Sequence, residues 1–116
     1  AALRFQLGVI LLDLQRDVPA MDVFQRLTED FPELPEPFNN IALLHARAGQ
    51  LEQARQALEM ALRNNPALVA ARQNLGDIHL RLALQAWEAV ALALPADAAL
   101  QRKLKLSREL LAAPLR

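Results

Sequence analysis

The sequence predicts an all-α fold in which helical hairpins repeat as a right-handed solenoid, forming a single domain over residues 1–116. Composition is the first reason: 53% of the residues are hydrophobic but only 4% are aromatic, and the strong helix formers Leu and Ala dominate. Proline spacing is the second. The interval from Pro32 to Pro66 matches the length of one helix-turn-helix unit, which is about 34 residues. The third is a register of small and large residues that returns at the same interval.

Local signals set the helix ends. Pro19 lies just inside the second helix, where its missing N–H is not needed, and Gly49 can take the left-handed conformation that ends a helix. Pro37 marks a new start because proline disfavours helical geometry in the preceding residue. Asp97 is a suitable N-cap for the last helix. Together with hydrophobic periodicity, these signals predict helices at about 2–14, 18–31, 37–48, 51–64, 69–80, 83–94 and 98–112.

The repeat register explains how the hairpins pack. Gly8, Ala42 and Gly76 recur at the repeat interval and would let neighbouring helices approach closely. Phe24 and Leu58 recur at the same interval and would fill the space beside them. The expected units are 1–34, 35–68 and a shortened 69–97, followed by a C-terminal capping helix at 98–113.

The second unit carries the most complete motif, which consists of Phe38, Ile41-Ala42, His45, Gly49, Ala54, Leu58, Ala61 and Pro66. This pattern resembles the tetratricopeptide repeat (TPR) family, and the resemblance covers residues 1 to 97. It implies a TPR-type solenoid with a role in protein–protein interaction. The sequence of the units also resembles exported TPR proteins of proteobacteria, which favours the periplasm slightly over the cytoplasm.

The third unit lacks its turn. In the second unit a full turn separates Ala42 in the first helix from Ala54 in the second, but the corresponding interval from Gly76 to Ala83 is much shorter. No Gly, Pro, Asn or Ser stands between Asp77 and Ala83 to break a helix. Either one helix continues through this segment, or a strained short turn lies near Leu82. A continuous helix would align one apolar stripe: Gly76, Leu80, Ala83, Trp87, Val90 and Leu94.

The stripe predicts self-association. A straight helix cannot fold back on itself, so the stripe needs another partner. Leaving Trp87, Val90 and Leu94 in water would forgo about 1.5–3 kcal/mol each. We therefore expect a homodimer in which two antiparallel long helices exchange the missing pairings, as in a domain swap. The alternative is an ordinary monomer with the strained turn.

Charge and composition count against several classes of partner. The formal net charge is zero, and a basic run near the end, formed by Arg102, Lys103, Lys105 and Arg108, has no interleaved aromatic residues to stack on bases. We expect no nucleic-acid partner. No unbroken apolar run reaches the length of about 18 residues that a spanning helix needs, which predicts no membrane insertion. With no Cys there is no disulfide or thiolate chemistry.

Catalysis is not expected. His45 and His79 are one repeat apart and could suggest a metal or acid–base site with Asp77, but no third ligand can be named. Partly buried packing positions are the simpler interpretation of both histidines. Ser107 is the only serine and has no nearby His, and there is no Gly-rich phosphate loop. The sequence thus predicts no enzyme activity, no metal and no cofactor.

The resemblance implies a concave binding face on the first helix of each unit. Gln6, Asn40 and Asn74 form a ladder of amides at the repeat interval, and amides can donate to and accept from an extended peptide backbone. The predicted peptide-binding residues are Phe5, Gln6, Val9, Asn39, Asn40, Leu43, Arg47, Gln73, Asn74, Asp77 and Arg81.

The partner itself is an unidentified protein or peptide. Family members that grip the C-terminal carboxylate of chaperones use Lys and Arg at positions where this chain has Phe5, Val9, Ala70 and Asn74, so a chaperone clamp is not expected. Two functions remain open. One is an interaction scaffold that binds a peptide and self-associates through residues 75–94, and the other is a purely structural dimerisation module with no peptide ligand.

Overall fold

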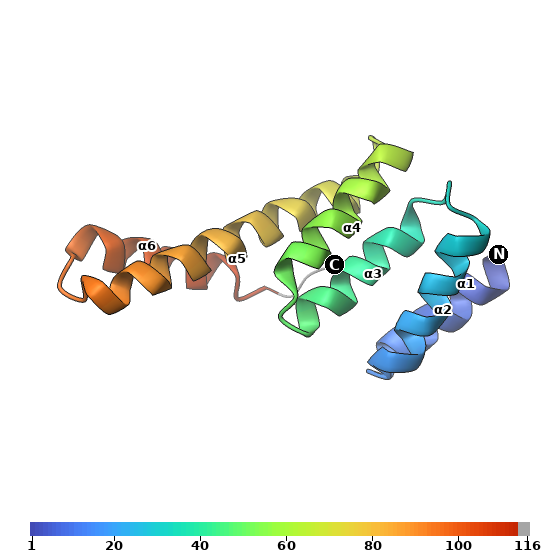
Figure 1. The fold of residues 1–116 in the computed structure, drawn as a ribbon, viewed down its shortest axis with the longest axis horizontal. Coiled ribbons are helices and arrows are strands. Elements are labelled where there is room, and N and C mark those ends of the chain that lie inside the picture. Colours follow the sequence, from blue (N-terminus) through green and yellow to red (C-terminus); the bar gives the residue numbers. More distant parts are fainter. Residues whose placement is uncertain (114–116) are drawn as a thin grey trace.

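The structure, a computed structural model, describes residues 1–113, so the last three residues of the predicted domain lie outside the described residues. This range contains six α-helices and no strand. The helices are α1 (Ala2–Asp13), α2 (Asp17–Asp30), α3 (Glu36–Arg47), α4 (Leu51–Asn64), α5 (Val69–Ala93) and α6 (Ala98–Leu110). They form an elongated molecule of 53 × 28 × 20 Å, drawn in Figure 1.

The first four helices form two packed hairpins, α1 with α2 and α3 with α4. Phe24 and Leu58 are each 0% exposed and lie in two adjoining hydrophobic clusters. A Cβ placed on Gly8 would lie 2.6 Å from Cε1 of Phe24, so the helices approach as closely as the small residue allows. The predicted pairing of a small residue with a large one is confirmed here.

Two turns require a left-handed residue. Gly49 has φ of 76°, as predicted for the turn between α3 and α4. Gln15 stands one repeat earlier, in the turn between α1 and α2, and adopts φ of 58° although it carries a side chain. The Asp97 cap is also confirmed, since its side chain accepts a hydrogen bond from the backbone N–H of Leu100 at 3.0 Å.

Helix α5 runs unbroken for 25 residues. The separate helices expected at 69–80 and 83–94 are one helix in the structure, because no residue between Asp77 and Ala83 interrupts the hydrogen-bonded backbone. The first half of α5 packs on α4 and buries Ala71, Asn74 and Ile78. Its second half leaves the two-hairpin body.

The second half of α5 and helix α6 together form an arm, which projects from the body in Figure 1. Helix α6 packs on α5 alone among the described helices and buries Leu100 and Leu104, which are 7% and 3% exposed. The long helix therefore has a partner within its own chain. This corrects the expectation that its second half must find all its packing elsewhere, since α6 folds back beside it after the turn at Pro95.

Candidate functional site

The predicted self-association stripe is exposed at three of its six residues. No heavy atom lies within 4 Å of a Cβ placed on Gly76, in contrast to the crowded Gly8. Val90 and Leu94 are 45% and 53% exposed. Leu80, Ala83 and Trp87 are half-buried. We call the stripe the seam, and its members are Gly76, Leu80, Ala83, Trp87, Val90 and Leu94.

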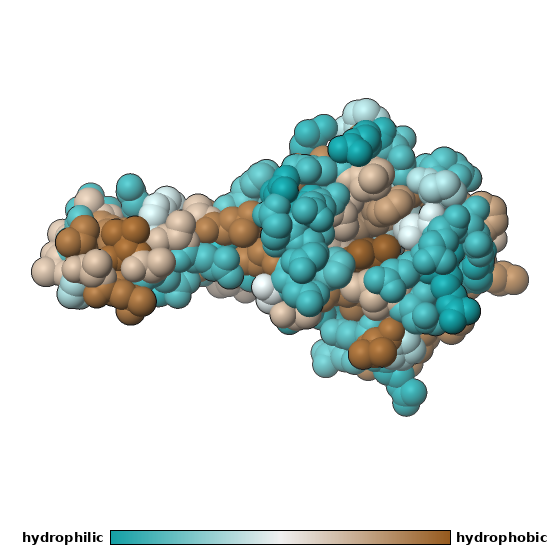
Figure 2. Space-filling model, in the orientation of Figure 1, coloured by the Kyte–Doolittle hydropathy of each residue, from teal (hydrophilic) through white to brown (hydrophobic). Residues whose placement is uncertain are grey.

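Helix α6 packs on α5 and leaves Val90 and Leu94 of the seam exposed. Its charged side chains reach Trp87 and Glu88: the Lys103 ammonium lies 5.6 Å from the centre of the Trp87 ring, and Arg108 approaches Glu88 at 3.8 Å. Apolar side chains still gather at the end of the arm, as Figure 2 shows, where Leu92 is 88% exposed. An exposed apolar patch of this kind is typical of an interaction surface.

Part of the predicted peptide face is occupied by internal packing. Asn74 and Asn39 are only 2% and 8% exposed, and the Asn74 amide donates to Asn39 Oδ1 at 3.1 Å. Neither side chain is positioned to meet a ligand. The ladder of Gln6, Asn40 and Asn74 is therefore incomplete, because its third member connects α5 to α3 inside the molecule.

Other predicted face residues also have internal contacts. The rings of Phe5 and Phe24 pack edge to face with centroids 5.9 Å apart. Arg47 donates to Asp17 Oδ1 at 2.8 Å and to the Leu12 carbonyl at 3.4 Å. The members that keep accessible surface are Gln6, Arg47 and Gln73, which are exposed, and Phe5, Val9, Asn40, Leu43, Asp77 and Arg81, which are half-buried.

Arg81 belongs to a pocket that the sequence reasoning missed, at the junction of the body and the arm. The pocket has a volume of about 340 Å³. Its lining comes from the turn between α3 and α4 and from α5 and α6: Ala46, Gly49, Leu51, Arg81, Leu84, Gln85, Glu88, Arg108 and Leu111. Of these, only Arg81 was among the predicted site residues. The repeat register could have indicated the pocket. It aligns Arg81 with Arg47, but it places Leu51 where Arg47 has its partner Asp17.

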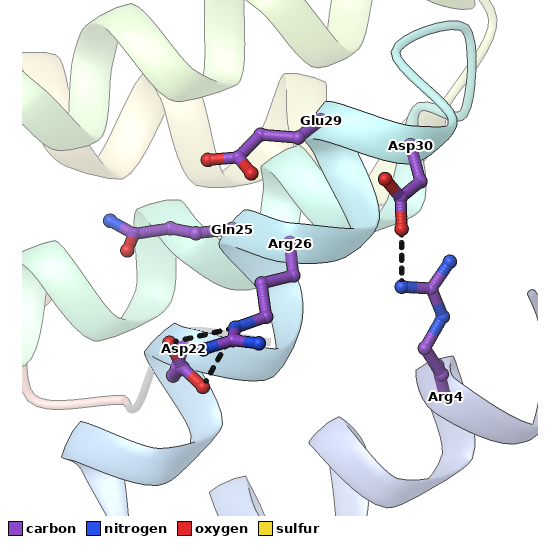
Figure 3. Close-up of a pocket in the computed structure, with 6 residues that line it drawn as sticks. All are labelled: Arg4, Asp22, Gln25, Arg26, Glu29 and Asp30. Atoms are coloured by element: carbon purple, nitrogen blue, oxygen red, sulfur yellow. Dashed lines mark hydrogen bonds and ion pairs between the residues drawn. The ribbon is translucent and has the colours of Figure 1, made fainter.

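A second, more polar pocket lies between α1 and α2. It measures about 490 Å³ and is lined by Arg4, Asp22, Gln25, Arg26, Glu29 and Asp30. Figure 3 shows that both arginines point at carboxylates within it: Arg4 contacts Asp30 at 2.6 Å and Arg26 contacts Asp22 at 3.2 Å. Its cationic groups are already paired, so it offers little to an added ligand.

The two histidines do not come together as a site. His45 is half-buried and its Nδ1 lies 2.8 Å from Gln50 Oε1. His79 is exposed, which corrects the expectation that both would be partly buried. Within residues 1–113 the structure brings together no group of three or more His, Asp or Glu side chains that could hold a metal ion.

One charged cluster, on α4, shifts the pKa values of its own members. Arg55 donates hydrogen bonds to Glu52 and Glu59 on the same helix. The hydrogen bond from Arg55 lowers the pKa of Glu52 from its ordinary 4.5, with a smaller contribution from the charge of His79. The same two hydrogen bonds raise the pKa of Arg55. The cluster lies at the surface of α4 and has the character of a structural ion-pair network.

The basic run near the C-terminus is partly occupied, since Lys103 and Arg108 contact α5. In the described part of the chain, none of the helices combines the length and apolar character needed to cross a bilayer. The geometry thus defines an all-helical hairpin repeat with exposed apolar and polar faces, a class of protein that binds other polypeptides.

The comparisons identify the family. The family model for the tetratricopeptide repeat matches residues 1–33 and 40–67, which is more than half of the chain and covers two successive hairpins. The chain belongs to the tetratricopeptide repeat family, a family of interaction scaffolds. Among curated proteins, none matches the sequence.

A solved structure has the same fold. The first TPR of Spaghetti (RPAP3), bound to the HSP90 peptide SRMEEVD, superposes with a TM-score of 0.66 at 18% sequence identity. The superposition covers 97% of this chain and 95% of that one. At this identity the likeness shows the fold alone, an all-helical hairpin repeat.

Proposed function

We propose that this protein is a non-enzymatic interaction scaffold that self-associates through the seam. The observation that carries the proposal is the contrast between Gly8 and Gly76. An aromatic ring of the following helix fills the space beside Gly8. Gly76 stands at the same place in the register, but the space beside it holds no neighbour. In a dimer, the α5 helices of the two copies would lie antiparallel. The second half of the seam in one copy would then cover the first half of the seam in the other copy, where Gly76 is open.

Burial energetics support the pairing. Val90 and Leu94 keep about half of their surface in water, so covering both would contribute about 1 kcal/mol each. Trp87 is half-buried beside Lys103 and offers a large ring at the seam. In a two-fold dimer the same residues are buried in both copies, so each of these contributions to the free energy of association counts twice.

The test is light scattering of the purified chain across micromolar concentrations. We expect a dimer whose fraction falls on dilution, with a blue shift of the fluorescence of Trp87, the only tryptophan, as the dimer forms. Val90→Glu with Leu94→Glu should give a folded monomer, because both side chains are half exposed and a charge there is tolerated only without a partner.

Leu92→Glu is the matched control, since Leu92 lies on the same helix outside the seam and is 88% exposed. It should leave the dimer intact. A wild-type chain that stays monomeric at high micromolar concentration would rule out self-association, as would a dimer that survives the double substitution. Trp87→Glu is a poorer probe because Trp87 also contacts α6.

We further propose that the accessible part of the first-helix face binds an extended peptide. The support is chemical: Gln6, Asn40 and Gln73 present amides beside the half-buried Val9 and Leu43. The bound peptide of the similar RPAP3 domain makes such a ligand reasonable for this architecture.

Peptides selected by display on the folded protein provide the test. Binding should be lost when Asn40 and Gln73 are both changed to alanine and kept when the exposed Gln53 is changed instead. Should no peptide be selected, or should the double variant bind equally well, the protein is better described as a structural dimerisation module.

A further inference from the structure

The junction pocket contains an arginine that lacks the partner its equivalent has. Arg47 and Arg81 stand at the same position of successive repeats. Arg47 donates to Asp17 Oδ1 at 2.8 Å and to the Leu12 carbonyl at 3.4 Å. Leu51 occupies the position one repeat after Asp17, and it lines the pocket beside Arg81. The turn that faces Arg81 therefore supplies no carboxylate.

The guanidinium of Arg81 has unused hydrogen-bonding capacity. Its Nε is the one buried side-chain nitrogen or oxygen without a hydrogen-bond partner in the described chain. The ion pairs found among residues 1–113 do not include it. A guanidinium that makes no ion pair favours a ligand that supplies an acceptor, and a carboxylate is the acceptor that best matches the fork of a guanidinium.

The rest of the pocket defines what accompanies that carboxylate. Arg108 and Glu88 also line it, and their closest N–O distance of 3.8 Å makes a loose pair. Two guanidinium groups thus face one carboxylate, which leaves the lining with a positive balance. Leu51, Leu84 and Leu111 supply apolar surface. The volume of about 340 Å³ lies within the range of small ligand pockets.

We propose that this pocket binds an acidic side chain, Asp or Glu, that is flanked by an aliphatic residue of a partner polypeptide. The carboxylate takes at Arg81 the position that Asp17 takes at Arg47, and the aliphatic side chain packs on Leu51 and Leu84. Glu88 repels a second acid, so the ligand carries one carboxylate within an apolar stretch. None of the seam residues lines the pocket, so the pocket and the seam are distinct surfaces.

The probe is the peptide acetyl-Leu-Asp-Leu-amide, which has a side-chain carboxylate and no terminal one. Titration into the full chain, followed by the ¹H–¹⁵N signal of the Arg81 Nε–H group, should give a saturable shift. The matched peptide with Asn in place of Asp should bind at least about tenfold more weakly, because a neutral amide loses the charge-assisted hydrogen bonds. A third peptide, acetyl-Leu-Leu with a free terminal carboxylate, distinguishes a chain end from a side chain.

Variants complete the experiment. Arg81→Gln should abolish binding of the Asp peptide, measured by the shifts of backbone amides around Leu84, while Arg63→Gln, at an exposed position of α4, should leave it unchanged. Equal binding of the Asp and Asn peptides, full binding by a folded Arg81→Gln chain, or no shift with the Asp peptide would each overturn the proposal. Stronger binding of acetyl-Leu-Leu would overturn the assignment to a side chain. Because the readout is peptide binding, failure here is distinct from a change in oligomeric state.

Discussion

The aromatic ring of Phe24 occupies the space in which a side chain at Gly8 would stand, with 2.6 Å between Cε1 of the ring and a Cβ placed on the glycine. Gly76 holds the same register position two repeats later and has no neighbour within 4 Å. Glycine at one register position thus has opposite surroundings in the first and third repeats. The difference arises because α2 folds back over α1, whereas α5 continues past the point where its turn would be.

Gly8→Ala should therefore destabilise the fold. The added methyl group would force Phe24 out of a fully buried position, which costs about 1–3 kcal/mol, and better helix propensity would recover up to about 1 kcal/mol of this. Urea unfolding should show a lower midpoint. Gly76→Ala is the control, measured at a protein concentration low enough for the chain to be monomeric, and should raise the midpoint instead, since its methyl group meets open space within the chain. A Gly8→Ala chain as stable as the wild type would show that Phe24 is not tightly held.

Substitutions at the two left-handed turn residues should have opposite effects on stability. Gln15→Gly should stabilise the protein by about 0.5–1 kcal/mol, because a side chain at φ of 58° is strained and glycine is not. Gly49→Ala, at φ of 76°, should destabilise it by about 1 kcal/mol. Thermal unfolding of the two variants measures both effects. Changes of the same sign in the two variants would contradict this account of the turns.

Asn74→Ala should lower stability by about 1–3 kcal/mol, because it leaves the buried Asn39 carbonyl without the donor that now lies 3.1 Å away. Asn40→Ala, at a half-buried position with accessible surface, should change stability by no more than about 0.5 kcal/mol. Chemical unfolding of both variants distinguishes a packing amide from a ligand-facing one. Equal losses would mean that the buried amide pair contributes little.

Acid titration should reveal the surface network on α4. Since Arg55 lowers the pKa of Glu52 below 4.5, the charged form of Glu52 is favoured in the folded state. Its contribution to stability is present above pH 4.5 and is lost as the pH falls through the lower folded pKa. In an NMR titration of the Glu52 carboxyl carbon, Arg55→Gln should move the midpoint up toward 4.5. Arg63→Gln should not move it, and an unchanged midpoint in Arg55→Gln would assign the shift to another cause.

Much of the fold could be predicted because its determinants are local and repeated. The prolines up to Pro95, Gly49 and Asp97 each set a helix end by their own backbone chemistry, and the structure has helix ends within a residue or two of those positions. The pairing of Gly8 with Phe24 followed from the repeat register. A run without helix breakers after Asp77 likewise indicated that the third unit differs from the others.

The candidate site was harder to predict because it depends on which side chains find partners within the chain. Asn74 has the register position of Asn40, but the packing of α5 on the body buries it against Asn39. The fold-back of α6 onto α5, and with it the junction pocket, depends on contacts between residues that no repeat relates. Register could only indicate that Arg81 lacks the aspartate that Arg47 has.

Because α5 is continuous, one helix contains backbone amides with two very different degrees of protection from hydrogen exchange. Its first half is covered by α4 and the hairpins behind it, whereas its second half is covered by α6 alone. Amide protons from Arg72 to about Leu80 should therefore exchange with solvent only when the whole body opens, and those beyond Ala83 whenever α6 detaches. A single uninterrupted helix thus spans two cooperative units, and the boundary between them falls where the ordinary repeat would have had its turn.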